Sequence, residues 1–214
     1  MAGEIIKKLK LIMAYPFMEV DKVNAEVLIE LLNDFKVGNE VLEIGPGGRP
    51  IIESFNCEKK IIIDIPQGIG YCSSLGYICH DQDAGNDKWD IEDESVDMIV
   101  SNQCLEHIPQ TDHFISEAHR VLKKGGVFIL SAPNKGSLIS IVFLLLTFTH
   151  PMNAVFDEFY MLRNPISTNR MEKQDSDRFG HHHLRLFTKR ARNDLLIAHS
   201  FCVLKNHGEV GVYH

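Results

Sequence analysis

The stretch Glu40-Val-Leu-Glu-Ile-Gly-Pro-Gly-Gly48 decides the fold, because it joins a short apolar run to a glycine-rich turn. The apolar run over 40–44 predicts a buried strand. The glycines that follow permit positive φ and let a ligand approach the backbone closely. Pro50 suits the first turn of a helix that runs to about Phe55. Glu43 therefore places a carboxylate at a strand end, directly before a turn that is suited to receive a ligand.

Further along the chain, apolar runs alternate with helical patterns. This predicts parallel βαβ units in a doubly wound, Rossmann-like α/β fold, with a mainly parallel sheet and helices on both faces. The predicted strands cover residues 60–65, 77–80, 96–100, 127–131 and 201–204. The predicted helices cover residues 21–35, the segment from Asp112 to the cations and glycines of Lys123–Gly126, and the segment from a cap at Thr188 to about Ser200.

The regular alternation breaks down between residues 135 and 180, which indicates an inserted lid after the fifth strand and not a second domain. We therefore expect a single domain over residues 1–214, with its core at about 38–134 and 181–214. Ligands of such sheets bind beyond the carboxyl ends of the strands, so the residues that follow each strand are the candidates for function.

A second acid stands at the end of the second strand. Asp64 lies nineteen residues beyond Gly45, and a carboxylate there can accept two hydrogen bonds from ribose hydroxyls. Dinucleotide enzymes use the same device, so a nicotinamide-dependent oxidoreductase is one interpretation. The G-x-G-x-x-G fingerprint of those enzymes needs glycine or alanine at position 50, where this chain has Pro50. The sequence therefore disfavours a dehydrogenase.

Six segments of the chain resemble, in order, the successive motifs of class I S-adenosylmethionine (AdoMet)-dependent methyltransferases, in the subgroup with an LEH segment after strand four. These segments are VLEIGPGGRP, IIIDI, HDQD, WDIEDESVDMIVSNQCLEHI, EAHRVLKKGGVFILSAPN and HLRLFTKRARNDLLIAHSFCV. The resemblance covers roughly residues 38–134 and 181–204. It implies an enzyme that binds AdoMet at the carboxyl ends of its first parallel strands.

The resemblance also implies which residues meet each part of AdoMet. The methionine half would be met by Glu43, Gly45, Gly47, Gly48, Asn102 and Gln103. The ribose would be held by Asp64, and the adenine edge would lie beside Asp81 and Gln82. For Asp81 the structural alternative is a plain surface acid.

Three features depart from the family pattern. Arg49 stands where the third glycine of G-x-G-x-G is usual, and Gly48 lies one residue early. The helix before Phe201 ends in His199-Ser200, where a glycine is usual. Only residues 208–213 remain for the last strand of such a sheet, so either a short strand or none is expected there.

Composition limits the partners and the compartment. A formal net charge of −7 and a pI near 5.9 argue against nucleic acid as a partner, because its phosphates demand a basic face. The five cysteines are an odd number without metal-ligand spacing, which indicates reduced thiols in a cytoplasmic protein. The consecutive residues His181, His182 and His183 cannot all face one ion from a strand or helix, so no metal is expected.

Methyl transfer needs no protein nucleophile, because the positive sulfonium of AdoMet already activates the methyl group. Two histidines, His107 and His183, are candidate general bases for the acceptor. The structural alternative for His107 is that it stabilises its loop together with Glu106. A non-catalytic AdoMet-binding or scaffolding protein is a second interpretation of the whole chain.

The residues after strand four indicate the acceptor. The chain has Asn102-Gln-Cys-Leu105 there, and not the N/D-P-P-Y/F motif that often marks amide or nucleobase nitrogen acceptors. This favours an oxygen or carbon atom on a small-molecule or lipid-like acceptor.

The apolar run Leu138–Phe148 is too short to span a bilayer. One interpretation is a lid helix packed inside the domain, or a dimer interface. The other is an apolar wall for a lipid-like acceptor, with weak contact to a membrane surface aided by Lys7, Lys8 and Lys10. The sequence predicts no particular oligomeric state.

Overall fold

A computed structural model describes residues 38–47, 50–134, 136–147, 160–162, 171–173, 184–185, 187–207 and 210–214. The helix predicted over 21–35 lies outside the described residues, as do the lysines of the first ten residues. Gly48, Arg49 and His183 also lie outside them.

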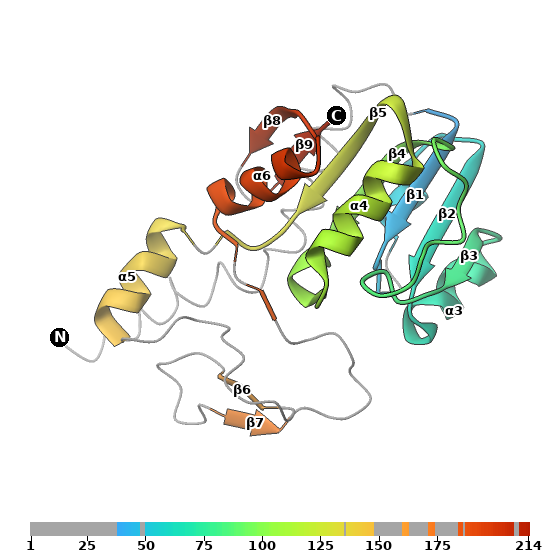
Figure 1. Ribbon diagram of the computed structural model, residues 1–214. Helices are drawn as coiled ribbons and strands as arrows, with labels where there is room; N and C mark the ends of the chain where they lie inside the picture. The colour runs from blue at the N-terminus through green and yellow to red at the C-terminus, as the bar shows by residue number, and fades with distance from the viewer. Residues whose placement is uncertain are drawn as a thin grey trace. The chain divides into compact units, whose positions relative to one another are not determined.

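The centre of the fold is a seven-stranded sheet with the order β3-β2-β1-β4-β5-β9-β8 within the described residues (Figure 1). The neighbouring strands from β3 to β5 are parallel, whereas β9 is antiparallel to both β5 and β8. The strand bounds are Glu40–Ile44 (β1), Lys59–Asp64 (β2), Ile78–Asp81 (β3), Val96–Asn102 (β4), Leu122–Ser131 (β5), Val203–His207 (β8) and Val210–Tyr213 (β9). The predicted doubly wound, mainly parallel sheet is confirmed.

Helices connect these strands, and a separate two-stranded sheet lies within the region predicted as an insertion. The helix bounds are Ile51–Ser54 (η1), Pro66–Ser74 (α3), Leu105–His107 (η2), Thr111–Val121 (α4), Leu138–Thr147 (α5) and Lys189–Ala198 (α6), where η marks a 3₁₀ helix. The small sheet pairs Tyr160–Leu162 (β6) with Met171–Lys173 (β7). Among the described residues, no helix combines the length and apolarity needed to span a bilayer.

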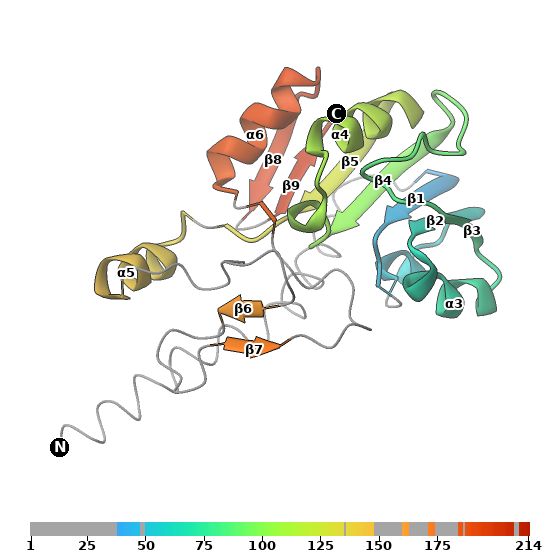
Figure 2. The same ribbon diagram turned by 60° about the horizontal axis from the view of Figure 1, so that its bottom comes forward.

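One face of the large sheet carries the main core under α4 and α6 (Figures 1 and 2). Alternate strand residues such as Leu42, Ile44 and Phe128 point to this face, as expected for side chains of period two. They pack against Phe114 of α4 and Leu196 of α6, all of which are buried. This packing holds the carboxyl ends of the strands in a fixed register.

The helix α4 ends earlier than predicted. Its last residue is Val121, and Leu122 already has extended backbone angles and begins β5, so the predicted end at Lys123–Gly126 is wrong. The cation at Lys123 does not serve a helix terminus, because its Nζ lies 2.8 Å from an oxygen of Asp97 on β4. The lysine at position 123 therefore pairs with an acid on the neighbouring strand and does not interact with a helix dipole.

Two other helices differ from expectation. The turn after β1 continues only into the short η1, although a helix to about Phe55 was predicted. The helix α3 was not predicted, because its two glycines, Gly68 and Gly70, have low helix propensity. Pro66 at its first position is typical of a helix start. Thr188 is confirmed as the cap of α6, since its Oγ1 accepts a hydrogen bond from the amide of Ala191 at 3.1 Å.

The last strand of the sheet is present. β9 lies between β5 and β8, so of the two expected outcomes, a short strand or none, the structure has the short strand. It is anchored by Arg192 of α6, a buried residue whose Nε donates to the Tyr213 hydroxyl at 2.8 Å. Arg192 Nη2 also donates to Asn206 Oδ1 at 2.9 Å, which ties both strands of the hairpin to α6.

The apolar helix α5 exposes much of its surface. The exposed side chains share one broad face of the helix, and they are Leu138, Ile141, Val142, Leu144, Leu145 and Leu146. A lid helix packed wholly inside the domain is therefore not what the structure shows. The inserted lid itself stays a prediction.

Candidate functional site

The carboxyl ends of β1 to β5 meet at one edge of the sheet. The register pairs Asp64 with Asp81, Ile44 with Ile63, and Asn102 with Ser131. The predicted residues therefore follow one another along this edge in the order of the strands: those after β3, β2, β1 and β4. The structure brings these predicted residues together.

Glu43 is almost fully buried, and its carboxylate supports the turn after β1. Its two oxygens accept hydrogen bonds from the backbone amides of Ile51 and Ile52, at 3.1 and 3.0 Å. Burial raises the pKa of Glu43 to about 7, although these two hydrogen bonds act in the opposite direction. The carboxylate thus fixes the start of η1 relative to β1. Its contact with the methionine half of AdoMet, which the resemblance implies, stays a prediction.

The two described glycines of the turn have left-handed backbones but different surroundings. Gly45 has φ +67°, and a Cβ there would lie 2.4 Å from Cys104 Sγ. Gly47 has φ +57°, and a Cβ there would meet no heavy atom of the described residues within 4 Å. Gly45 therefore permits a close approach of β1 to the loop after β4, whereas no described residue fills the space beside Gly47, where a ligand can lie.

Asp64 closes the other side of this turn. Its Oδ2 accepts from the Gly47 amide at 2.9 Å, and its Oδ1 accepts from the Ile65 amide at 2.8 Å. Burial raises its pKa, and the two hydrogen bonds oppose that shift. A Cβ at Gly68 would lie 1.9 Å from Oδ2, so α3 needs glycine where it passes this carboxylate. Each carboxylate oxygen can accept more than one hydrogen bond, so Asp64 keeps capacity for ligand hydroxyls.

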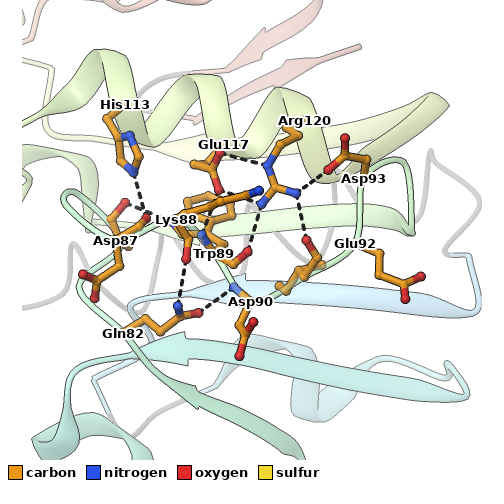
Figure 3. Close-up of polar contacts among 12 residues, drawn as sticks. Gln82, Asp87, Lys88, Trp89, Asp90, Glu92, Asp93, His113, Glu117 and Arg120 are labelled. Atoms are coloured by element: carbon orange, nitrogen blue, oxygen red, sulfur yellow. Dashed lines mark hydrogen bonds and ion pairs between the residues drawn. The ribbon is translucent and has the colours of Figure 1, made fainter.

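The residues after β3 divide into one exposed acid and one loop-building amide. Asp81 is exposed at the end of the strand. Gln82 donates from Nε2 to the Lys88 carbonyl and accepts at Oε1 from the Asp90 amide, both at 2.9 Å (Figure 3). Its backbone amide donates to the Asp64 carbonyl at 3.2 Å. The side chain of Gln82 therefore shapes the loop that a ligand at this edge would face.

A polar cluster stands after β4 and β5. The amide and the side chain of Gln103 both donate to the Ser131 hydroxyl, at 3.1 and 3.2 Å, and that hydroxyl donates to Asn102 Oδ1. Gln103 has φ +52°, unusual for a residue other than glycine. Ser131 was not predicted, yet its place as the last residue of β5 was the signal that could have identified it.

The short helix η2 carries the candidate base His107, which is half-buried. Its neighbour Glu106 is buried and its carbonyl accepts from the Arg185 amide at 3.1 Å. Burial also raises the pKa of the Cys104 thiol, which disfavours a reactive thiolate. Arg185 Nη2 donates to the Pro109 carbonyl, so Arg185 lies against η2 and the residues that follow it.

The described residues contain no group of histidine, cysteine and acidic side chains arranged to hold a metal ion. In contrast, the turn at Gly47 and the carboxylate of Asp64 fit an adenosine-containing ligand. Gly47 offers open space beside its backbone, and Asp64 has acceptor capacity for ribose hydroxyls.

Comparison with known proteins decides the family. A family model described as a methyltransferase domain matches residues 18–204. The chain belongs to this methyltransferase family. The membership in a methyltransferase family that was predicted from the sequence motifs is thereby confirmed.

Individual relatives agree with the family assignment. The chain is 28% identical over 125 residues to phosphoethanolamine N-methyltransferase 2 of Caenorhabditis elegans, a match that covers 51% of this chain and 27% of that protein. An AdoMet-dependent methyltransferase structure from Clostridium acetobutylicum ATCC 824 superposes with a TM-score of 0.58 and 16% identity, covering 96% and 97% of the two chains. One from Archaeoglobus fulgidus superposes with a TM-score of 0.55 and 18% identity, covering 88% and 74%. These structures share the fold of this chain. Both are named as AdoMet-dependent methyltransferases, and AdoMet is the cofactor predicted here from the sequence.

Proposed function

We propose that this methyltransferase uses AdoMet to methylate a small-molecule or lipid-like acceptor. The observation that carries the proposal is the joint placement of Gly47 and Asp64: a space that no described residue fills lies beside Gly47, whose amide binds a carboxylate with spare acceptor capacity. AdoMet supplies a methyl group that its positive sulfur already activates. The chain's own task is to bind both partners, align them and exclude water.

The bound cofactor would lie along the edge from β3 to β4. Asp64 would hold the ribose, the loop after Asp81 and Gln82 would border the adenine, and the other predicted residues would meet the methionine half. Those other residues are Glu43, Gly45, Gly47, Gly48, Asn102 and Gln103.

The experiment that tests this function compares AdoMet with NAD by calorimetry and thermal shift. A ligand that binds only the folded state raises the melting temperature, so AdoMet is expected to raise it and NAD is not. Formation of S-adenosylhomocysteine with any acceptor separates an enzyme from a non-catalytic AdoMet-binding or scaffolding protein. Binding of NAD without AdoMet would favour the oxidoreductase interpretation instead.

Replacing Asp64 with alanine is expected to weaken AdoMet binding by about 10- to 150-fold. The variant loses its charge-assisted contact with the ribose, which is worth about 1.5–3 kcal/mol in total. Calorimetry measures the change. Asp81→Ala is the matched control, because Asp81 is exposed on the neighbouring strand end, and its loss should change the Kd less. Wild-type affinity in Asp64→Ala would remove the ribose assignment.

For the acceptor, we propose a molecule with an apolar part that meets α5. The helix begins seven residues after β5 ends at the candidate edge, and it exposes Leu138 and Leu145 two turns apart. The motif after β4 favours an oxygen or carbon acceptor atom. The relationship to a phosphoethanolamine N-methyltransferase makes an amine the alternative, so phosphoethanolamine belongs in the same assay.

A homologous series of alkyl alcohols and alkylamines of increasing chain length tests this acceptor class. Each buried methylene is worth about 0.8 kcal/mol, so kcat/KM should rise severalfold per carbon over the first members of the series. The double variant Leu138→Ser, Leu145→Ser should flatten this rise with little change in stability, because both side chains are exposed. Turnover independent of chain length, or confined to phosphoethanolamine, would refute an apolar wall. Sedimentation with liposomes reports separately on membrane contact.

A further inference from the structure

The loop between β3 and β4 is held by the helix α4. Residues 82–95 leave the candidate edge and return to the start of β4. In their middle, the amide of Trp89 donates to Glu117 Oε2 at 2.8 Å, and the Trp89 carbonyl accepts from Arg120 Nη2 at 2.9 Å (Figure 3). Both backbone groups of Trp89 are therefore bound by one ion pair on α4.

Arg120 fastens the loop at further points. Its Nη1 donates to the Ile91 carbonyl at 2.8 Å and to Asp93 Oδ1 at 2.6 Å. Its Nε and Nη2 form a bidentate pair with the carboxylate of Glu117, at 2.9 and 2.6 Å. Burial acts to raise the pKa of Glu117, but its hydrogen bonds with Arg120 and Trp89 lower it below the usual range. The hydrogen bond with Glu117 raises the pKa of Arg120, so both groups stay charged. The planar guanidinium matches this set of acceptors, which a lysine cannot reproduce.

The clamped part of the loop connects directly to the site. The Lys88 carbonyl and the Asp90 amide, on either side of Trp89, are the two groups bound by the side chain of Gln82. The backbone of Gln82 in turn donates to the Asp64 carbonyl. The Trp89 ring is buried against Phe114 of α4, with ring centroids 5.6 Å apart. A continuous chain of contacts therefore runs from Arg120 through Trp89 to the predicted ribose and adenine residues.

We infer that Glu117 and Arg120 are positioning residues for the adenosine half of AdoMet. They do not touch the site edge, but they fix the loop whose first residue, Gln82, faces that half. The inference rests on the proposed function, because it assumes that AdoMet is the ligand. AdoMet and S-adenosylhomocysteine share the adenosine half, so a change in this pair should affect the affinity for both ligands alike.

The test uses Arg120→Met and Glu117→Gln in the full chain. Both variants should weaken AdoMet and S-adenosylhomocysteine by the same factor, about 3- to 30-fold, as measured by calorimetry well below the melting temperature. KM for AdoMet should rise while kcat at saturating AdoMet stays near the wild-type value. Arg120→Lys keeps the charge but loses the bidentate geometry, so it should recover only part of the affinity.

A second readout does not depend on ligand. Trp89 is the only tryptophan of the chain and is buried, so its fluorescence reports on the loop alone. Acrylamide should quench Trp89 more strongly in Arg120→Met than in the wild type. Asp93→Asn removes only the charge of an exposed partner of Arg120 and keeps an oxygen that can accept the same hydrogen bond, so it should change neither quenching nor affinity.

Arg192→Met controls for a general loss of stability. It breaks a buried network between α6 and the β8–β9 hairpin, away from the loop. It should lower the melting temperature and leave the Kd of AdoMet unchanged. Clamp variants with wild-type Kd, or with no more loss than Arg192→Met, would show that the pair is only structural and would overturn the inference. A wild type that binds neither AdoMet nor S-adenosylhomocysteine would instead overturn the proposed function, and the inference with it.

Discussion

Replacing Gly45 with alanine is expected to destabilise the protein by about 2–5 kcal/mol and to abolish ligand binding at the turn. Two costs add. An alanine at φ +67° pays about 1–2 kcal/mol for the left-handed backbone, and its Cβ would lie 2.4 Å from Cys104 Sγ, an overlap that costs about 1–3 kcal/mol to relieve. Relief requires β1 and the loop after β4 to separate, which moves the candidate site itself. Denaturant unfolding measures the change in the free energy of unfolding.

Gly47→Ala separates these two costs. Gly47 has nearly the same backbone angle, φ +57°, but its Cβ would meet nothing among the described residues. Gly47→Ala should therefore lower the free energy of unfolding only by the backbone term, about 1–2 kcal/mol. The double variant Gly45→Ala, Cys104→Ala removes the sulfur and, compared with Cys104→Ala alone, should recover most of the overlap cost, because only the Cys104 Cβ at 3.0 Å remains. Equal destabilisation by the two alanine substitutions, or no recovery in the double variant, would contradict a close contact between Gly45 and Cys104.

The parts of the fold that could be predicted are those in which the apolar pattern and the tertiary environment agree. Val41, Leu42 and Ile44 are apolar because both faces of β1 are covered, so their pattern identified a buried strand. The end of α4 could not be predicted, because the cations and glycines at 123–126 resemble a helix terminus. The competing influence was the pairing of Lys123 with Asp97, a residue far away in the sequence.

The candidate site shows the same division. The glycines and acids at strand ends could be predicted, since parallel strands bring their carboxyl ends to one edge. The clamp of Glu117 and Arg120 could not, because the spacing of the two residues suggests only a surface ion pair of a helix. Their backbone partners, including Trp89 and Ile91, carry no side-chain signal for this contact. Sequence patterns can therefore indicate which side chains approach a ligand. They say little about which side chains bind the backbone of the loops that carry those ligand-binding residues.

The substitution His107→Ala is expected to reduce turnover by about 10²–10⁴-fold while AdoMet binds as in the wild type. We propose His107 as the group that takes the acceptor's proton, because η2 follows β4 directly and leaves the imidazole half-buried at the candidate edge. Its second candidate, His183, lies outside the described residues, so His183→Ala is made alongside. Turnover is measured with the best acceptor of the alkyl series, and AdoMet affinity by calorimetry.

Two further measurements separate proton transfer from support of the loop. Added imidazole should restore part of the turnover of His107→Ala, because a small base can enter the space that the side chain left, whereas a loop defect would not respond. His199→Ala is the matched control: that histidine bonds to Asp112 and Ser116, at the C-terminal end of α6, and its loss should leave turnover unchanged. If His107→Ala and His183→Ala both retain wild-type rates, then no histidine base is required, and the enzyme works by aligning donor and acceptor alone.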